Sequence, residues 1–160
     1  MLMVRPRLPE DAASLAPRLR TEDLLEIKAA TGEEPLAALE RCSVASDPCF
    51  AITAGEQLIA LFGVVPDGPD RGIVWLVGSD EIARRPFRFA RASRYWVERL
   101  HERYRVLWNL ADARNETHLR WIRFCGFTIH RRVEQHGTGR KPFYEFSRTQ
   151  PKRGPRGAEE

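Results

Sequence analysis

The chain has 160 residues, enough for one domain, and its 42% hydrophobic and 30% charged residues exclude collagen-like, mucin-like and fully disordered chains. No apolar run approaches the ~20 residues of a membrane span, and the first residues lack the apolar core of a secretory signal. The formal net charge of +4 divides unevenly, with −6 in residues 1–80 and +10 in residues 81–160, and 23 of the 26 basic residues are Arg, which suits bidentate contact with phosphate or carboxylate.

The first half of the chain predicts a short strand, a group of helices and then three strands. Pro9, Glu10 and Asp11 suit the start of a helix, and Thr21 is the expected N-cap of the next helix. After residue 48 the pattern changes to apolar, β-branched runs, and the run at 73–77 is expected to be a central strand. The predicted elements are a strand at 4–7, helices at 12–19, 21–31 and 35–41, and strands at 49–53, 58–65 and 73–77.

The second half predicts a long helix, a buried strand, a shorter helix and a hairpin. Asn115 is expected to cap the shorter helix, and Gly126 is expected to stop it. One face of the long helix carries the larger side chains Phe89, Trp96, Leu100 and Tyr104, with Ser93 between them. The predicted elements are helices at 81–104 and 115–125 and strands at 105–110, 127–134 and 142–148.

One domain is predicted at residues 1–147, followed by a flexible basic tail at residues 148–160. The tail contains Pro and Gly and no apolar residue larger than Ala158, so it cannot bury enough surface to fix itself. Cys42, Cys49 and Cys125 lack metal-ligand spacing, which predicts no metal site and reduced thiols in a cytoplasmic compartment.

The segment from Asn115 to Phe127, together with the order of elements, resembles the GNAT superfamily of N-acetyltransferases. Members commonly have Asn, then Ala three residues later, then an aromatic residue and a Gly-Phe pair. Asn115, Gly126 and Phe127 match, whereas His118 replaces the Ala and Ile122 stands where many members have Tyr. The resemblance implies an α/β fold over about residues 3–148: a mixed central β-sheet flanked by helices on both faces, with a C-terminal β-hairpin.

A narrower resemblance is carried by Leu107-Trp108-Asn109 together with Asn115, His118 and Gly126. This pattern, which follows a basic helix, resembles the internal virion protein A family of short-tailed bacteriophages. The resemblance implies a phage-encoded protein of the host cytoplasm or virion, which acts in virion assembly or as a virion component. Other virion or assembly proteins would be its partners, and its acyltransferase activity would be degenerate.

The GNAT resemblance also implies a place for acetyl-CoA. These enzymes hold its pyrophosphate at a helix N-terminus, where a Gly-rich loop lets the backbone approach the phosphates. The equivalent residues 81–90 contain no Gly, so Arg side chains would have to contact the phosphates instead. The candidate cofactor-binding residues are Val77, Arg84, Arg85, Arg88 and Asn115.

Acyl transfer needs a base for the substrate ammonium and an acid for the leaving thiolate. Asp80 and Glu81, at the end of the central strand, are the candidate bases, although Asp80 equally suits a helix N-cap. Ile122 stands where the resemblance places the usual acid, a Tyr. Tyr144 and His118 are candidates to replace it, although their spacing in the sequence selects neither.

The basic half supports further hypotheses. Seven Arg lie between Arg84 and Arg103, interleaved with aromatic residues, a pattern found in nucleic-acid binding, but no recognition motif accompanies it. An acidic protein surface is another partner for the same residues. The sequence therefore predicts a GNAT-fold protein of virion assembly, with an active acetyl-CoA-dependent N-acyltransferase as the alternative.

Overall fold

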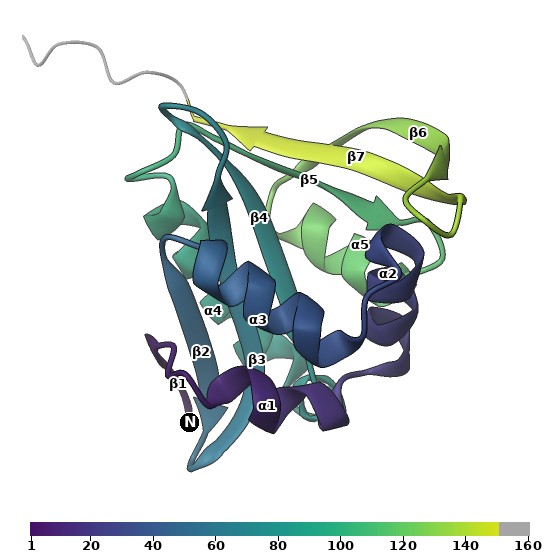
Figure 1. Cartoon of the computed structure of the whole chain (residues 1–160). Helices are drawn as coiled ribbons and strands as arrows, with labels where there is room; N and C mark the ends of the chain where they lie inside the picture. The colour runs from purple at the N-terminus through teal and green to yellow at the C-terminus, as the bar shows by residue number, and fades with distance from the viewer. Residues whose placement is uncertain (151–160) are drawn as a thin grey trace, which may run out of the picture.

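The computed structural model describes residues 1–150, in which seven strands form one mixed sheet (Figure 1). The strands lie in the order β1-β2-β3-β4-β5-β7-β6, and every neighbouring pair is antiparallel except β4 and β5. The strands are β1 (Leu2–Pro6), β2 (Cys49–Ala54), β3 (Gln57–Pro66), β4 (Arg71–Gly78), β5 (Val106–Asp112), β6 (Thr128–His136) and β7 (Lys141–Thr149). Strand β4 lies inside the sheet, as the apolar run at 73–77 predicted, and β3 lies between it and β2.

One face of the sheet is covered by the N-terminal helices, which lie in front of the strands in Figure 1. These are α1 (Asp11–Leu15), the 3₁₀ turn η1 (Ala16–Arg18), α2 (Thr21–Thr31) and α3 (Pro35–Ala45). Leu15, Leu19 and Leu39 pack with Ala51 and Leu61 of the sheet in one buried cluster. Burying each large apolar side chain contributes roughly 1.5–3 kcal/mol, so this cluster fixes the helices on the sheet.

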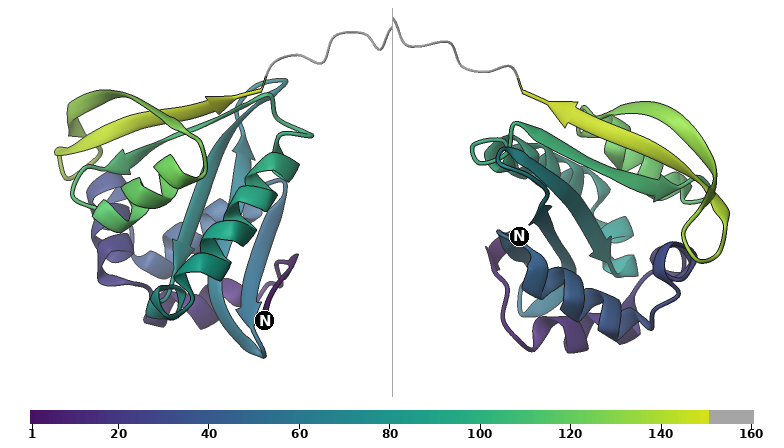
Figure 2. Two further views of the ribbon diagram at one scale, coloured as in Figure 1. Left: turned by 180° about the vertical axis from the view of Figure 1, so that it is seen from behind. Right: turned by 45° about the horizontal axis from the view of Figure 1, so that its top comes forward.

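The opposite face is covered by α4 (Pro86–Leu100) and α5 (Glu116–Phe124), seen from behind in Figure 2. The buried residues of α4 are Phe89, Ser93, Val97 and Leu100, at helical spacing, with Trp96 partly buried beside them. The predicted α/β fold with helices on both faces and a C-terminal hairpin is therefore confirmed.

Two predictions at helix starts were wrong. The helix expected at 81–104 is divided into η2 (Asp80–Arg84) and α4, because Pro86 disfavours a helical conformation at Arg85, whose φ and ψ are −134° and 52°. Thr21 is the first residue of α2 and not its cap. Arg20 takes the N-cap position, where its N–H donates to the Gly78 carbonyl at 2.9 Å.

The end of α5 was predicted correctly, whereas the predicted tail began too early. Gly126 follows the helix with φ +84°, a left-handed conformation that favours Gly. Strand β7 extends to Thr149, so Arg148 and Thr149 of the predicted tail belong to the sheet. The rest of that tail, 151–160, lies outside the described residues. Within residues 1–150 no helix is both long and apolar enough to cross a membrane.

Candidate functional site

Strands β4 and β5 pair over only three residues and then diverge. Arg71–Ile73 of β4 lie opposite Val106–Trp108 of β5, and beyond this point a gap opens in the middle of the sheet (Figure 1). The Asn109 side chain stands at the branch, where its Nδ2 donates to the Val74 carbonyl at 2.8 Å. A side-chain amide therefore takes the place of the next ladder hydrogen bond, and β4 presents an unpaired edge beyond it.

Strand alternation decides which backbone groups face this gap. The Ser79 N–H donates to Ile59 of β3, so the neighbouring Gly78 turns its N–H and C=O away from β3 and toward the gap. Asp23 Oδ2 accepts from the Gly78 N–H at 2.9 Å, and the Gly78 carbonyl accepts from Arg20. Leu76 faces the gap in the same way, between the bonded positions Val74 and Gly78. Val77, a predicted cofactor-binding residue, turns its backbone toward β3 instead.

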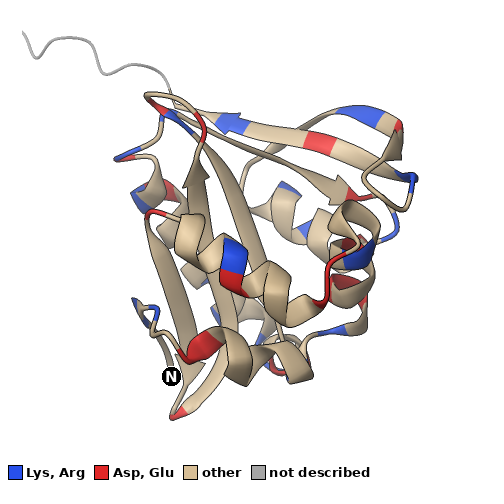
Figure 3. Ribbon diagram, viewed as in Figure 1, with Lys and Arg blue, Asp and Glu red and all other residues tan. Residues whose placement is uncertain are grey.

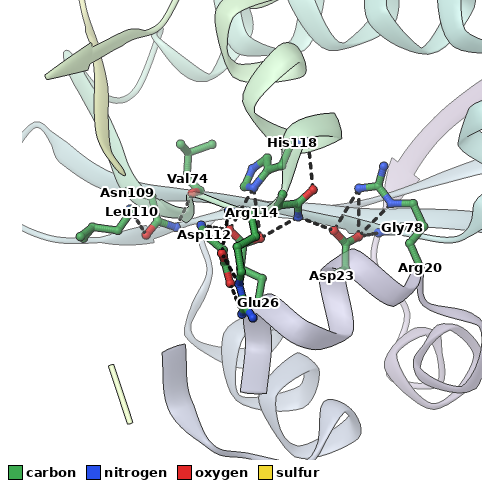
Figure 4. Close-up of polar contacts among 11 residues, drawn as sticks. Arg20, Asp23, Glu26, Val74, Gly78, Asn109, Leu110, Asp112, Arg114 and His118 are labelled. Carbon is green, nitrogen blue, oxygen red and sulfur yellow. Dashed lines mark hydrogen bonds and ion pairs between the residues drawn. The ribbon is translucent and has the colours of Figure 1, made fainter. Parts of the chain in front are cut away.

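A network of polar side chains crosses the gap from α2 to β5 and α5 (Figure 4). Glu26 of α2 accepts from the Asp112 N–H at 2.5 Å, from Asn115 Nδ2 at 3.3 Å and from His118 Nδ1 at 3.1 Å. Asn115 Nδ2 also approaches Asp23 at 3.4 Å. Helix α2 therefore contacts both arms of the divided sheet. Its Asp23 binds the end of β4, and its Glu26 binds the end of β5.

Local sequence spacing explains how these side chains meet. Arg20, Asp23 and Glu26 are three residues apart, so they lie on one face of α2. Asn115 is the N-cap of α5, as predicted, and its Oδ1 accepts from the His118 N–H at 3.1 Å. The cap brings the Asn115 amide and the His118 ring to the same end of α5, opposite α2.

The charges of the network are paired. Arg20 and Asp23 form a buried salt bridge at 3.0 Å, and Arg114 pairs with the buried Asp112 at 2.7 Å. Burial favours the neutral imidazole of His118, but the charge of Glu26 and its hydrogen bond outweigh burial and raise the pKa of His118 above 6.5. The contact with Glu26 therefore favours the imidazolium form of His118, at the point where the two arms diverge.

Two cavities, one on each face of the sheet, meet at Leu76 and His118. The α4–α5 groove, of about 650 Å³, lies between η2, α4 and α5. The α2–α3 cavity, of about 300 Å³, lies between these two helices and the diverging strands. Leu76 and His118 line both of them. The groove is also lined by Arg20, Asp80, Ala83, Phe87, Arg120, Trp121 and Phe124. The cavity is also lined by Glu26, Ile27, Leu39, Trp75, Leu110 and Phe143.

The predicted phosphate loop forms η2 at the end of the groove. Its N–H groups are used internally: Glu81 donates to Ser79 Oγ, Ile82 to the Ser79 carbonyl and Arg85 to the Ile82 carbonyl. Ser79, and not Asp80, is the N-cap of this turn, because its Oγ accepts while Asp80 begins the helix. These three N–H groups are therefore engaged within the loop and are not available to a phosphate.

The predicted Arg residues lie on η2, at Arg85 and at the start of α4, and none of them lines the groove; Arg88 lines another cavity, next to β1. Arg84 and Arg85 both pair with Glu81, at 2.9 and 3.3 Å, so Glu81 is engaged in ion pairs. Arg88 is exposed in the first turn of α4. Phe87 is also exposed and lines the groove, whereas Phe89 belongs to the core. Basic residues recur along α5 and the β6–β7 hairpin in Figure 3, and acidic residues on α1 and α2.

The remaining predicted residues lie away from the junction. Tyr144 lies on β7, where its hydroxyl is 3.5 Å from Arg132 Nη1 of the edge strand β6, and it lines neither cavity. Burial raises the pKa of the Cys125 thiol to about 12, so it is an unreactive core residue. Residues 1–150 contain no cluster of His, Cys, Asp or Glu that could hold a metal ion.

The sequence interpretation missed Arg20, Asp23 and Glu26 altogether. Their three-residue spacing is the available signal, but charged residues at this spacing usually form a solvated helix face. It also missed Leu76, because the phase of a fully apolar strand is visible only after its pairing with β3 is known.

No protein-family model matches the sequence, and no curated protein matches it. Solved structures match over nearly the whole chain. The ribosomal-protein-S18-alanine N-acetyltransferase from Escherichia coli has a TM-score of 0.71 and 14% identity, over 98% of each chain. The spermidine N-acetyltransferase from Vibrio cholerae, in complex with CoA and spermine, has a TM-score of 0.66 and 16% identity, over 93% of this chain and 95% of that one.

A GNAT-family acetyltransferase from Streptococcus pneumoniae also matches, with a TM-score of 0.63 and 14% identity, over 94% of this chain and all of the other. At these identities the similarity is one of fold. The mixed seven-stranded sheet and the helices that flank it match these structures over more than nine tenths of the chain. The chain therefore has the fold of the GNAT acetyltransferases.

Proposed function

We propose that the protein is an acyl-CoA-dependent N-acyltransferase whose two substrates approach from opposite faces of the sheet. The observation that carries the proposal is the meeting of the α4–α5 groove and the α2–α3 cavity at Leu76 and His118. A transferase for two substrates needs two separate binding volumes that share the point of reaction. The CoA-bound GNAT neighbours support the choice of acyl donor.

The groove fits the pantetheine arm of acyl-CoA better than its phosphates. The backbone of Leu76, on the unpaired edge of β4, offers an N–H and a C=O to an extended amide chain. Without a glycine cradle, the phosphates would be held by the guanidinium groups of Arg84, Arg85 and Arg88. Acyl-CoA supplies a thioester when bound: the amine nitrogen forms a bond to its carbonyl carbon and the carbon–sulfur bond breaks.

The ion pair at the junction can handle the protons of this exchange. A primary ammonium must lose two protons in becoming an amide, and the leaving thiolate takes one. The Glu26 carboxylate can accept the first proton from an ammonium in the α2–α3 cavity. This proton then passes from Glu26 to solvent. Because Nδ1 of His118 faces Glu26, the proton on Nε2 is the one available to a thiolate in the groove. His118 then regains the second proton from the amine nitrogen.

The test is release of free thiol from acetyl-CoA in the presence of a panel of primary amines. We expect turnover by the wild-type chain and a kcat lower by about 10²–10⁴ in His118→Gln, the range for loss of a general acid or base. His130→Gln, at an exposed position on β6, is the matched control and should retain full activity. Absence of turnover with every amine, or an unaltered kcat in His118→Gln, would contradict the proposal.

A second candidate is a docking role in virion assembly, as the resemblance to the phage family implies. The observation that favours it is the loop before α4, where η2 uses its own N–H groups and Phe87 is 87% exposed beside Arg84 and Arg88. Exposed aromatic and Arg side chains are typical anchors of protein interfaces. An acidic surface of a virion protein is the proposed partner, in the host cytoplasm or the particle, and nucleic acid is the alternative anion.

The docking role predicts that the chain is a stoichiometric component of particles, or of an assembly intermediate, purified from infected cells. Quantitative mass spectrometry of these particles measures it. Phe87→Ser with Arg88→Ala should abolish incorporation, while the control Arg132→Ala on β6 should leave it unaltered. A chain absent from both particles and intermediates would rule this role out.

A further inference from the structure

The α2–α3 cavity has an apolar body with a charged inner end. Its walls include Leu39, Trp75 and Phe143, and its inner end holds Glu26 and His118. The other polar groups of the lining are bonded elsewhere: Arg41 pairs with Glu33 at 2.9 Å, and Thr31 Oγ1 donates to the Ile27 carbonyl at 3.0 Å. Asn109 is fixed at the branch of the sheet. Apart from the Arg41–Glu33 pair and the Cys42 thiol, whose pKa burial raises, the ionisable groups of the lining lie at the inner end.

Charge balance at this inner end has room for one cation. Asp23 is neutralised by Arg20 and Asp112 by Arg114, so Glu26 relies on the proton of His118. A ligand ammonium can share the Glu26 carboxylate with the imidazolium until the ammonium gives up its first proton. A second ammonium on the same ligand would lie among apolar side chains, where an unpaired charge costs several kcal/mol.

The tip of the β6–β7 hairpin lies beside α2 (Figures 1 and 2). The Gly139 N–H donates to the Ala29 carbonyl at 3.0 Å. Gly137 has φ +70°, and a Cβ there would lie 2.5 Å from the Ala29 oxygen. The hairpin and α2 are therefore in backbone contact, which leaves no path between them for an extended peptide.

We infer that the acceptor is a small primary amine with a single positive charge and an apolar body of about one ring. Its ammonium pairs with Glu26, and its body packs against Trp75, Leu39 and Phe143 at the α2–α3 cavity. Polyamines are excluded by their second charge, and an extended peptide is disfavoured because it cannot pass between the hairpin and α2. This inference rests on the proposed transferase function, because it identifies the acceptor of that reaction.

The experiment is calorimetric titration of the full chain, without acyl-CoA, with four probes of defined chemistry. Cyclohexylmethylamine is the expected ligand, and cyclohexylmethanol is its uncharged match. Spermidine tests the exclusion of a second charge, and an alanine tetrapeptide tests the exclusion of a peptide. We expect the amine to bind at least tenfold more tightly than each of the other three.

Glu26→Gln should remove the tenfold preference for the amine over the alcohol, whereas Glu40→Gln, exposed on α3, should retain it. If Glu26→Gln does not fold, the four wild-type affinities still decide the question. Equal or tighter binding of the alcohol, spermidine or peptide, or no binding of the amine, would overturn the inference.

A separate titration with acetyl-CoA distinguishes the two proposals. Binding of acetyl-CoA without selective binding of the amine refutes the acceptor assignment alone. Binding of the amine without binding of acetyl-CoA refutes the transferase function.

Discussion

The Asp23 carboxylate of α2 accepts a hydrogen bond from the backbone N–H of Gly78, at the end of β4, with an N–O distance of 2.9 Å. Both residues are buried, and the same carboxylate forms a salt bridge with the buried Arg20. A helix side chain thus completes the hydrogen bonding of a strand that has lost its neighbour. Loss of the Asp23 carboxylate should therefore destabilise the fold.

Asp23→Ala should lower the free energy of unfolding by about 3–5 kcal/mol, because it leaves the Arg20 guanidinium buried without a counter-ion. Asp80→Ala removes an exposed carboxylate at the start of η2 and should alter stability by less than about 0.5 kcal/mol. Urea denaturation followed by circular dichroism measures both. A loss below 1 kcal/mol in Asp23→Ala would show that α2 is not held in this way.

The His118–Glu26 pair predicts a pH-dependent stability. Because the pKa of His118 is raised in the folded chain, its contribution is complete below the unfolded value of 6.5 and is lost as pH rises through the folded pKa. The difference in unfolding free energy between wild type and His118→Gln should therefore be largest near pH 6 and smaller at pH 9. Denaturation series at both pH values test this, and a difference that grows with pH would contradict the ion pair.

Arg88→Ala should weaken acetyl-CoA binding roughly tenfold, the effect of losing one charge-assisted hydrogen bond to phosphate. Acetyl-pantetheine has the same thioester arm but lacks the nucleotide phosphates, so its affinity should be unaltered by the substitution. Isothermal titration with both compounds gives the comparison, with Arg132→Ala as a control on the distant strand β6. An equal loss for both compounds would place Arg88 elsewhere than at the phosphates.

Tyr144→Phe should leave acyl transfer within about twofold of wild type, since the hydroxyl lies near Arg132 at the edge of the sheet and neither cavity reaches it. The thiol-release assay with the best amine measures kcat and KM. A hundredfold fall in kcat would restore Tyr144 as the acid that the sequence suggested.

Much of the fold was predictable from local patterns. The apolar runs of β3 and β4, the helical spacing of Phe89, Ser93 and Leu100, and the Gly126 stop all record local preferences that the tertiary structure leaves in place. The break at Arg85 was also encoded, by Pro86, but the helical periodicity of the segment concealed it.

The site was less predictable, because its residues become related only through tertiary contacts. Asp23 and Gly78 are 55 residues apart, and Glu26 and His118 are 92 apart. Asn115 could be recognised as a helix cap from its neighbours, whereas its contact with Glu26 depends on how α2 lies against the divided sheet. Asp80 and Glu81 were selected by their position at the end of the central strand, and Tyr144 by its side-chain chemistry alone; neither criterion shows what each side chain faces.

The central claim is that the α4–α5 groove holds an acyl-CoA thioester arm that reaches Leu76 and His118. The most direct measurement is calorimetric titration of acetyl-CoA into the wild-type chain and into Ala83→Trp, which fills the groove from the exposed face of η2. Ala37→Trp, exposed on α3 across the sheet, is the control for the added ring. We predict that acetyl-CoA binds wild type and Ala37→Trp saturably and one to one, and that its affinity for Ala83→Trp is at least tenfold lower. Absence of binding to wild type, or equal affinity for all three chains, would contradict the account.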